Sequence, residues 1–339
     1  MIYGSGRYTR SMLQRKKVLI TGGCGYVGTR LVDEILKVTE WEVLICDTLW
    51  FGDFTTRSGR VIILEKSVSE LTLRDLDDVD TVIHLAGIPN DASAMLNTAL
   101  SWEVNVLHTA HLMRLCEKSN SVKRIAFASS GSVYGVSDSE RVTESLDLLP
   151  ISTYNKTKMA AERVVLSYSD KFKIFVVRPA TVCGLSRRMR FDVTVNMFVA
   201  QAFTEKKITV LGGSQIRPNI HIEDMVQVYL HLLNEERDCE AGIYNAGFQN
   251  LSVKTIAEQV SVMTGKDVEY KDSNDPRSYR LDSTKLMQTG FIPQRKVEDA
   301  MKEIWYSLQV GSTKIADNNF SVKWLKDKIE SLQEFTYPI

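Results

Sequence analysis

The chain reads Val18-Leu19-Ile20-Thr21-Gly22-Gly23-Cys24-Gly25-Tyr26-Val27-Gly28 near its N-terminal end. The first four residues form an apolar run that predicts a buried strand, and residues 31, 32, 35 and 36 are apolar at helical spacing. Between them, Gly22, Gly25 and Gly28 form a G-x-x-G-x-x-G pattern. Glycine permits a tight turn and close approach of the backbone to a pyrophosphate, and a helix N-terminus offers free N–H groups to the phosphates. In this strand–turn–helix context, the pattern predicts a dinucleotide-binding loop.

A second strand is predicted over residues 41–46, and Asp47 follows it directly, 19 residues after Gly28. An acid about 20 residues beyond the glycine pattern can accept hydrogen bonds from the hydroxyls of the adenosine ribose. A carboxylate there would repel a 2′-phosphate, so Asp47 favours NAD over NADP. The alternative is that Asp47 is a solvated acid in a turn.

Further apolar runs predict core strands over residues 61–64, 81–85, 124–128 and 174–177, with helical patterns between them. This alternation is typical of an α/β fold with a doubly wound parallel sheet. Ligands bind such sheets at the carboxyl ends of the strands. The residues of chemical interest follow those ends, at positions 22–28, 47, 86–87, 129–130 and 178–179.

Tyr154 and Lys158 lie four residues apart, so they share one face of a predicted helix. A nearby ammonium group favours the phenolate form of a tyrosine, whose ordinary pKa is about 10. A phenolate that forms near neutral pH is a usable general base. For the spacing alone, the alternative is a solvated helix with an incidental tyrosine and lysine.

The chain also carries a series of ordered motifs. They are T-G-G-C-G-Y-V-G at 21–28, H-L-A-G at 84–87, S-S-G-S-V-Y-G at 129–135, Y-N-K-T-K at 154–158, R-P-A-T-V-C-G at 178–184, R-P-N-I-H-I-E-D at 217–224 and Y-N-A-G at 244–247. With these motifs, the chain resembles the extended short-chain dehydrogenase/reductases of the sugar-nucleotide epimerase/dehydratase type, from about Lys17 to about Leu308. The resemblance implies a Rossmann-type, NAD-binding domain at 17–180 that carries the catalytic residues. It also implies a smaller C-terminal substrate-binding lobe at 181–310, with some segments returning to the Rossmann sheet.

The resemblance implies roles for individual residues. Tyr154 would take the proton of a sugar hydroxyl, Lys158 would lower the pKa of Tyr154 and bind the nicotinamide ribose, and Ser130 would hydrogen-bond the reacting oxygen. The implied contacts with NAD are made by Gly22, Gly25, Tyr26, Val27, Gly28, Asp47, Ser67, Val68, Leu85, Ala86, Gly87, Tyr154, Lys158, Arg178 and Pro179. Two positions depart from the family pattern: Ser67 stands where an aspartate usually faces adenine, and Cys183 replaces a tyrosine.

The substrate that the resemblance implies is a nucleoside-diphosphate sugar. Asn196 would touch its diphosphate, and Arg217 and Arg277 would pair with phosphate, because guanidinium groups match phosphate geometry. Three more arginines, at 187, 188 and 190, crowd the loop after residue 184 and add positive field near the diphosphate.

Composition argues against several other classes of protein. The 339 residues carry 42 Lys plus Arg and 42 Asp plus Glu, so the zero net charge disfavours nucleic acid as a partner. The dispersed cysteines and histidines predict no metal site, and the five scattered thiols favour the cytoplasm. No apolar run of about 20 residues predicts a membrane span. We expect a homodimer, a mobile basic extension over residues 1–16 and a helical tail over residues 311–339.

The choice of reaction rests on fewer residues. Family 4,6-dehydratases carry an acid two residues after the catalytic Ser/Thr, where this chain has Ser132, a poor acid for elimination. A non-catalytic dinucleotide-binding protein is disfavoured because Ser130, Tyr154 and Lys158 are all present. Because epimerases are the commoner outcome in the family that the chain resembles, we predict an NAD-dependent 4-epimerase that acts at C4 of the sugar. The alternative is a 4-dehydrogenase or reductase that gives a ketosugar.

Overall fold

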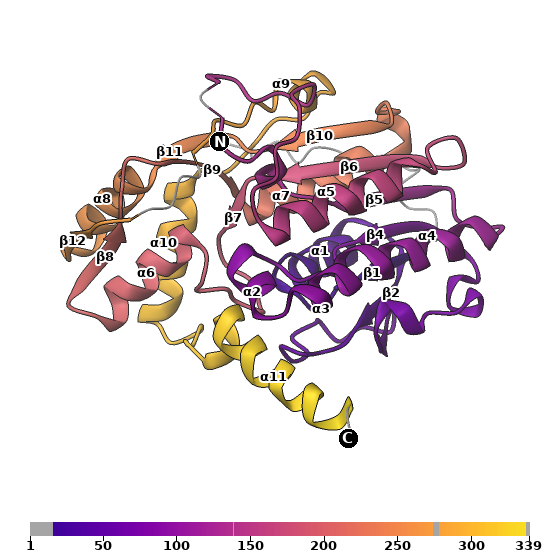
Figure 1. Cartoon of the computed structure of the whole chain (residues 1–339), viewed down its shortest axis with the longest axis horizontal. Coiled ribbons are helices and arrows are strands. Elements are labelled where there is room, and N and C mark those ends of the chain that lie inside the picture. Colours follow the sequence, from indigo (N-terminus) through magenta and orange to yellow (C-terminus); the bar gives the residue numbers. More distant parts are fainter. Residues whose placement is uncertain (1–15, 138, 274–277, 337–339) are drawn as a thin grey trace.

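The computed structural model describes residues 16–137, 139–273 and 278–336. A seven-stranded sheet forms its centre, and every neighbouring pair of strands in it is parallel (Figure 1). The strand order is β10 (Gly242–Ala246), β6 (Lys173–Pro179), β5 (Arg124–Ala128), β4 (Val79–His84), β1 (Lys17–Thr21), β2 (Glu42–Asp47) and β3 (Val61–Glu65). The predicted doubly wound parallel sheet is confirmed.

Helices cover both faces of this sheet, which is why its central strands are apolar along their whole length. Successive strand residues point to opposite faces. Val18 and Ile20 pack in one core with α1 (Tyr26–Val38) and α7 (Ile222–Leu233), whereas Leu19 packs in another with α4 (His108–Lys118) and α5 (Thr153–Leu166). Because these strands are parallel, the carboxyl ends of β1, β2 and β4 lie at the same edge of the sheet.

A smaller lobe lies beside the sheet and has a core of its own (Figure 1). Its strands form a three-stranded sheet of β11 (Gln249–Ser252), β9 (Ile216–His221) and β7 (Thr181–Cys183), and a two-stranded sheet of β12 (Asp267–Lys271) and β8 (Lys207–Leu211). Its helices are α6 (Thr194–Thr204), α8 (Val253–Thr264) and α10 (Val297–Gln309).

The chain passes between the two lobes several times. β6 ends at Pro179 and β7 begins at Thr181, so a single residue, Ala180, separates the two sheets. After β9, the chain returns to the main sheet to form α7 and β10, and the N–H of Ala180 donates to the carbonyl of Ala246 across 2.8 Å. The C-terminal half thus supplies one edge of the main sheet.

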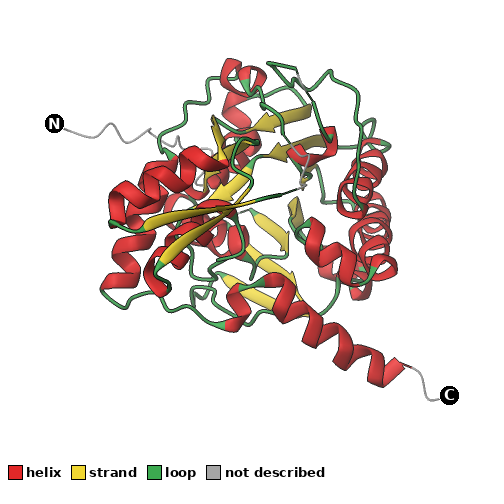
Figure 2. Ribbon diagram, turned by 60° about the vertical axis from the view of Figure 1, so that its left-hand side comes forward, coloured by secondary structure: helices red, strands yellow, loops and turns green. Residues whose placement is uncertain are grey.

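The last described helix, α11 (Ser321–Thr336), packs against the helices beside the main sheet and not against the small lobe alone. It contacts α2 (Asp91–Leu96) and extends from the body toward the C-terminal end (Figures 1 and 2). The indole N–H of Trp324 donates to the carbonyl of Trp50 across 2.5 Å, and the Asn318 amide donates to the carbonyl of Phe51 across 3.0 Å. These bonds tie the tail to the loop after β2.

The remaining short elements connect these layers. They are α3 (Thr98–Trp102), α9 (Thr284–Gln288), the π turn η4 (Glu103–Leu107) and the 3₁₀ turns η2 (Val68–Glu70), η3 (Leu73–Leu76), η5 (Gly131–Tyr134), η6 (Glu235–Arg237) and η7 (Asp317–Asn319). The predicted extension lies outside the described residues except for Lys16, which pairs with Glu235 across 2.7 Å.

Candidate active site

A cavity of about 800 Å³ opens at the carboxyl ends of the central strands and continues toward the small lobe. Residues that follow β1, β2, β3, β4, β5 and β6 line it, as do residues from β9 and α11. This is the place at which a doubly wound sheet binds ligands. Most of the predicted site residues meet here, although they come from distant parts of the sequence.

The glycine loop forms one wall of the cavity. Gly22 has a φ of +72°, and a Cβ there would lie 2.7 Å from the backbone nitrogen of Ala86. A Cβ at Gly28 would lie 2.5 Å from the carbonyl oxygen of Gly22. Neither position accepts a side chain, so the turn packs closely against the end of β4 and leads directly into the N-terminus of α1, where a pyrophosphate can approach the backbone. This cradle fits a dinucleotide such as NAD.

Asp47 lines the cavity at the end of β2. Its Oδ2 accepts the N–H of Cys24 across 3.0 Å, and its Oδ1 accepts the N–H of Leu49 across 2.9 Å. Burial raises the pKa of Asp47, while these two bonds act in the opposite direction. Each carboxylate oxygen keeps a further lone pair, so the group can also accept bonds from ribose hydroxyls.

The other cofactor residues lie along the same cavity. Ser67, Val68 and residues 85–87 all line it. Ser67 caps η2 and lies 3.4 Å from Nδ1 of His108, a lining residue that the sequence did not single out. Pro179 lines the wall at the end of β6.

The side chain of Arg178 is bound within the protein. It is 3% exposed and does not line the cavity; Nη2 pairs with Glu162 of α5 across 2.7 Å, and Nη1 donates to the hydroxyl of Tyr134 across 2.7 Å. The predicted contact of Arg178 with the cofactor stays a prediction. Its guanidinium joins β6 to α5 and η5.

Ser130 and Tyr154 both line the cavity, and Ser130 is one of the groups that lower the pKa of Tyr154. Ser130 is the N-cap of η5, and Tyr154 lies in the first turn of α5, which Ser152 caps through the N–H of Asn155. Burial raises the pKa of Tyr154 to about 12, and the nearby Ser130 hydroxyl and the charge of Arg190 oppose that effect.

Lys158 follows Tyr154 by one helical turn and is buried. Its Nζ lies 4.7 Å from the centre of the Phe127 ring, and burial lowers the pKa of Lys158 to about 8. Arg190 is one of the groups whose charge lowers the pKa of Tyr154. The same effect, which the resemblance assigns to Lys158, stays a prediction.

The predicted substrate residues have three different outcomes. Arg217, on β9, lines the cavity. Arg277 lies outside the described residues. Asn196 is fully buried and does not line the cavity; its amide donates to the Tyr26 hydroxyl across 3.0 Å and to the Arg190 carbonyl across 2.9 Å. These internal bonds use both N–H groups of the amide, and the predicted contact with the diphosphate stays a prediction.

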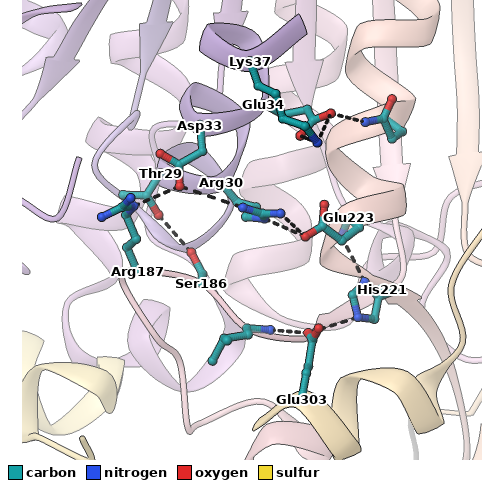
Figure 3. Close-up of polar contacts among 12 residues, drawn as sticks. Thr29, Arg30, Asp33, Glu34, Lys37, Ser186, Arg187, His221, Glu223 and Glu303 are labelled. Atoms are coloured by element: carbon teal, nitrogen blue, oxygen red, sulfur yellow. Dashed lines mark hydrogen bonds and ion pairs between the residues drawn. The ribbon is translucent and has the colours of Figure 1, made fainter. Parts of the chain in front are cut away.

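The loop from Gly184 to Arg190 is attached to the first turns of α1. The Ser186 hydroxyl lies 2.9 Å from that of Thr29, and Arg187 donates to Asp33 across 3.0 Å (Figure 3). The same figure shows Arg30 of α1 bonded to Glu223 of α7. The small lobe is thus joined to the helix whose N-terminus faces the cavity.

Several lining residues were missed from the sequence. They are Trp50 and Phe51 in the loop after β2, Asp192 in the loop after β7, and Ser321, Val322 and Leu325 in α11. Arg188 and Arg190, which the sequence analysis named, line the same wall. Arg190 pairs with Asp192 across 2.9 Å, and Asp192 accepts the N–H of Ser321 across 3.0 Å. The arginine cluster was the one signal that the sequence offered for this wall.

The described residues show neither a cluster of metal-binding side chains nor a membrane-spanning helix. In this part of the chain, no three His, Cys, Asp or Glu side chains are grouped to hold a metal ion, and all five cysteines are buried free thiols. Within residues 16–137, 139–273 and 278–336, no helix is long and apolar enough to cross a bilayer.

The chain is similar to proteins of known type. Residues 18–247 match the family described as "NAD dependent epimerase/dehydratase family". The chain is 26% identical over 323 residues to a UDP-glucose 4-epimerase of Lactobacillus helveticus, with 85% of this chain and 96% of that one covered. It is 26% identical over 313 residues to UDP-glucuronic acid decarboxylase 6 of Arabidopsis thaliana, with 87% and 89% covered.

A solved structure gives the same result for the fold and the cofactor. MoeE5 in complex with UDP-glucuronic acid and NAD superimposes with a TM-score of 0.78 at 25% identity, covering 87% of this chain and 99% of that one. The glycine cradle, Asp47 and the Ser130–Tyr154 pair lie together in one cavity, as an NAD-dependent enzyme of this kind requires. The chain belongs to the NAD-dependent epimerase/dehydratase family.

Proposed function

We propose that the protein interconverts the two C4 epimers of a nucleoside-diphosphate hexose, most simply a UDP-hexose. The observation that carries the proposal is that Ser130 and Tyr154 line the same cavity as the glycine loop. The UDP-glucose 4-epimerases among its relatives support the choice of reaction and nucleotide. Arg217, which lines the cavity from the small lobe, is the residue proposed to meet the diphosphate of the substrate.

The reaction follows from the chemistry of these side chains. Tyr154, as phenolate, takes the proton from the C4 hydroxyl while Ser130 hydrogen-bonds the same oxygen, so the carbon can give up a hydride. NAD, when bound, supplies the hydride acceptor for this step and the hydride donor for its reversal. After the 4-ketosugar turns over, hydride returns to the opposite face of C4 and Tyr154 returns the proton. Lys158 is proposed to bind the nicotinamide ribose.

The experiment is a product analysis with a panel of UDP-hexoses and the full chain. Epimerisation predicts an equilibrium mixture of C4 epimers, resolved by nuclear magnetic resonance, without net reduction of added NAD. Accumulation of a 4-ketosugar with stoichiometric nicotinamide reduction would instead establish the dehydrogenase alternative. No product with any sugar would overturn the proposal.

The cellular compartment and the oligomeric state belong to the same proposal. Five buried free thiols support a reducing compartment, for which we propose the cytoplasm. We also propose a homodimer, as the family resemblance implies, which light scattering on the purified protein tests.

A further inference from the structure

Arg188 is a buried cation with an unsatisfied donor. The residue is 3% exposed, and its Nε has no hydrogen-bond partner among the described residues. The arginines around it differ, because Arg187 pairs with Asp33 and Arg190 pairs with Asp192. Burying a charge without a partner is costly, and buried charges in proteins are normally paired. The arrangement therefore points to an anionic ligand.

The guanidinium is held in place before any ligand arrives. Its central carbon lies 4.0 Å from the centre of the Phe51 ring, in a cation–π contact. Phe51 is held in turn by the tail, since its carbonyl accepts the amide of Asn318 across 3.0 Å. On the other side, Ser186 donates to the carbonyl of Tyr26 across 2.8 Å, which fixes the loop that carries Arg188 over the start of α1.

Arg188 lies in the part of the cavity predicted to hold the cofactor. Arg188 lines the cavity, and the groups whose charges act on it include Asp47, Tyr26, Arg190 and Asp192. Tyr26 begins α1, and Asp47 is the acid at the end of β2.

We propose that Arg188 binds the pyrophosphate of the dinucleotide from the side opposite the glycine loop. The small lobe would then contribute directly to cofactor binding, and the pyrophosphate would lie between the N-terminus of α1 and a guanidinium. A 2′-phosphate at Arg188 is disfavoured because Asp47 would repel it. The diphosphate of the sugar nucleotide is assigned to Arg217 on β9 instead. This inference rests on the cofactor and does not depend on which reaction occurs at C4.

The test compares the affinities of ligands that differ in the number and position of their phosphates or in their base. Calorimetric titrations of the full chain, dialysed free of nucleotide, use ADP, adenosine, 2′-AMP and UDP with the unaltered protein and Arg188→Met. Loss of a charge-assisted bond predicts ADP binding weakened about 10- to 100-fold, with adenosine unchanged. Arg188→Lys, which keeps the charge but loses the planar fork, should lie between the two.

Arg57→Met is the matched control. Arg57 also follows β2, but its side chain is 80% exposed, it pairs with Asp53 across 2.8 Å, and it does not line the cavity. Its removal should change ADP affinity less than about twofold, because exposed charges are well screened. A weakening by Arg57→Met equal to that of Arg188→Met would reduce the effect to general charge and overturn the proposal.

Other outcomes also decide against it. Equal losses for ADP and adenosine would show that Arg188 only maintains the shape of the site. A selective loss of UDP would place it at the substrate, and a selective loss of 2′-AMP would place it at the ribose. Because Arg188→Met removes an unpaired buried charge, the melting temperature of the nucleotide-free protein should not fall. If that variant does not fold, the ratio of ADP to adenosine affinity in Arg188→Lys decides the question.

Discussion

Ser132 donates its hydroxyl proton to Oδ1 of Asn155 across 2.8 Å, and its oxygen lies 2.7 Å from that of Ser130. Asn155 is fully buried next to the catalytic tyrosine in α5, so its amide is a fixed acceptor. The residue two positions after Ser130 is thus a neutral hydroxyl whose proton is already engaged. It supports the Ser130 hydroxyl rather than supplying an acid to a leaving group.

Elimination of water from the sugar is therefore not expected. A 4,6-dehydratase must protonate the departing C6 oxygen, and Ser132 cannot do so at neutral pH. Incubation with UDP-glucose should give products that keep the mass of the substrate, or that of a 4-ketosugar with its C6 oxygen, in mass spectrometry. A 6-deoxy-4-keto sugar as the main product, seen as the loss of one water, would contradict this expectation.

Replacing Tyr154 by phenylalanine should slow turnover by about 10²–10⁴-fold, the usual cost of losing a general base. NAD affinity and the melting temperature should change little, since only one hydroxyl is lost. Tyr134→Phe is the control: its hydroxyl donates to Asn245 across 2.8 Å outside the cavity, so it should reduce stability but not the rate of the folded enzyme. Near-full turnover by Tyr154→Phe would remove Tyr154 from the mechanism.

Lys158 makes stability depend on pH in a defined direction. Burial lowers its pKa from 10.5 to about 8, so between these values the unfolded chain binds a proton that the folded protein does not. The unfolding free energy of the unaltered protein should therefore rise with pH across this window relative to Lys158→Met, by roughly 3 kcal/mol at about 1.4 kcal/mol per pH unit. Urea denaturation at pH 7 and pH 10 measures the difference. A difference between the two proteins that does not change with pH would show that the pKa of Lys158 is not lowered.

Asp47 should set the choice of cofactor. Asp47→Ala should weaken NAD binding and narrow the gap to NADP, because the variant loses the ribose acceptor and the charge that repels a 2′-phosphate. Calorimetric titration with both dinucleotides measures the ratio. Asp53→Ala removes a nearby charge that does not line the cavity and should alter the ratio less. Equal affinity of the unaltered protein for NAD and NADP would refute this role.

The tail should contribute to cofactor retention. Leu325 of α11 is 1% exposed and lines the cavity, so Leu325→Ala should speed NAD dissociation in stopped-flow displacement and destabilise the fold by about 2–5 kcal/mol. Lys326→Ala alters an exposed residue of the same helix and should change neither quantity. An unchanged dissociation rate in Leu325→Ala would limit the role of α11 to stability.

The fold and half of the site were predictable because they depend on local patterns. Glycine spacing, apolar runs and a helical i, i+4 pair locate Gly22, Asp47 and Tyr154 without any knowledge of distant contacts. A motif gives a position in the chain but not the direction of a long side chain. For Arg178, the motif does not indicate that the guanidinium pairs with Glu162, which lies on the helix before its own strand.

The remaining wall of the cavity depends on contacts between residues far apart in sequence. Trp324 bonds to a carbonyl 274 residues earlier, and Asn196 reaches back 170 residues to Tyr26. Nothing in the local sequence of α11 distinguishes a helix that closes a cofactor cavity from one that packs on a surface. The arginines at 187, 188 and 190 are adjacent in sequence, yet only the structure separates the paired from the unpaired ones.

The late return of β10 to the main sheet has a consequence for the synthesis of the chain. Until residues 242–246 leave the ribosome, the strand Phe175-Val176-Val177-Arg178 has no neighbour on one side, although β10 pairs with it in the finished sheet. An apolar strand with free N–H and C=O groups is a template for pairing with other chains. A shortened protein that ends before β10 should therefore aggregate rather than yield an isolated dinucleotide-binding unit. The two lobes are separate in shape, but the nascent chain cannot finish the first without most of the second.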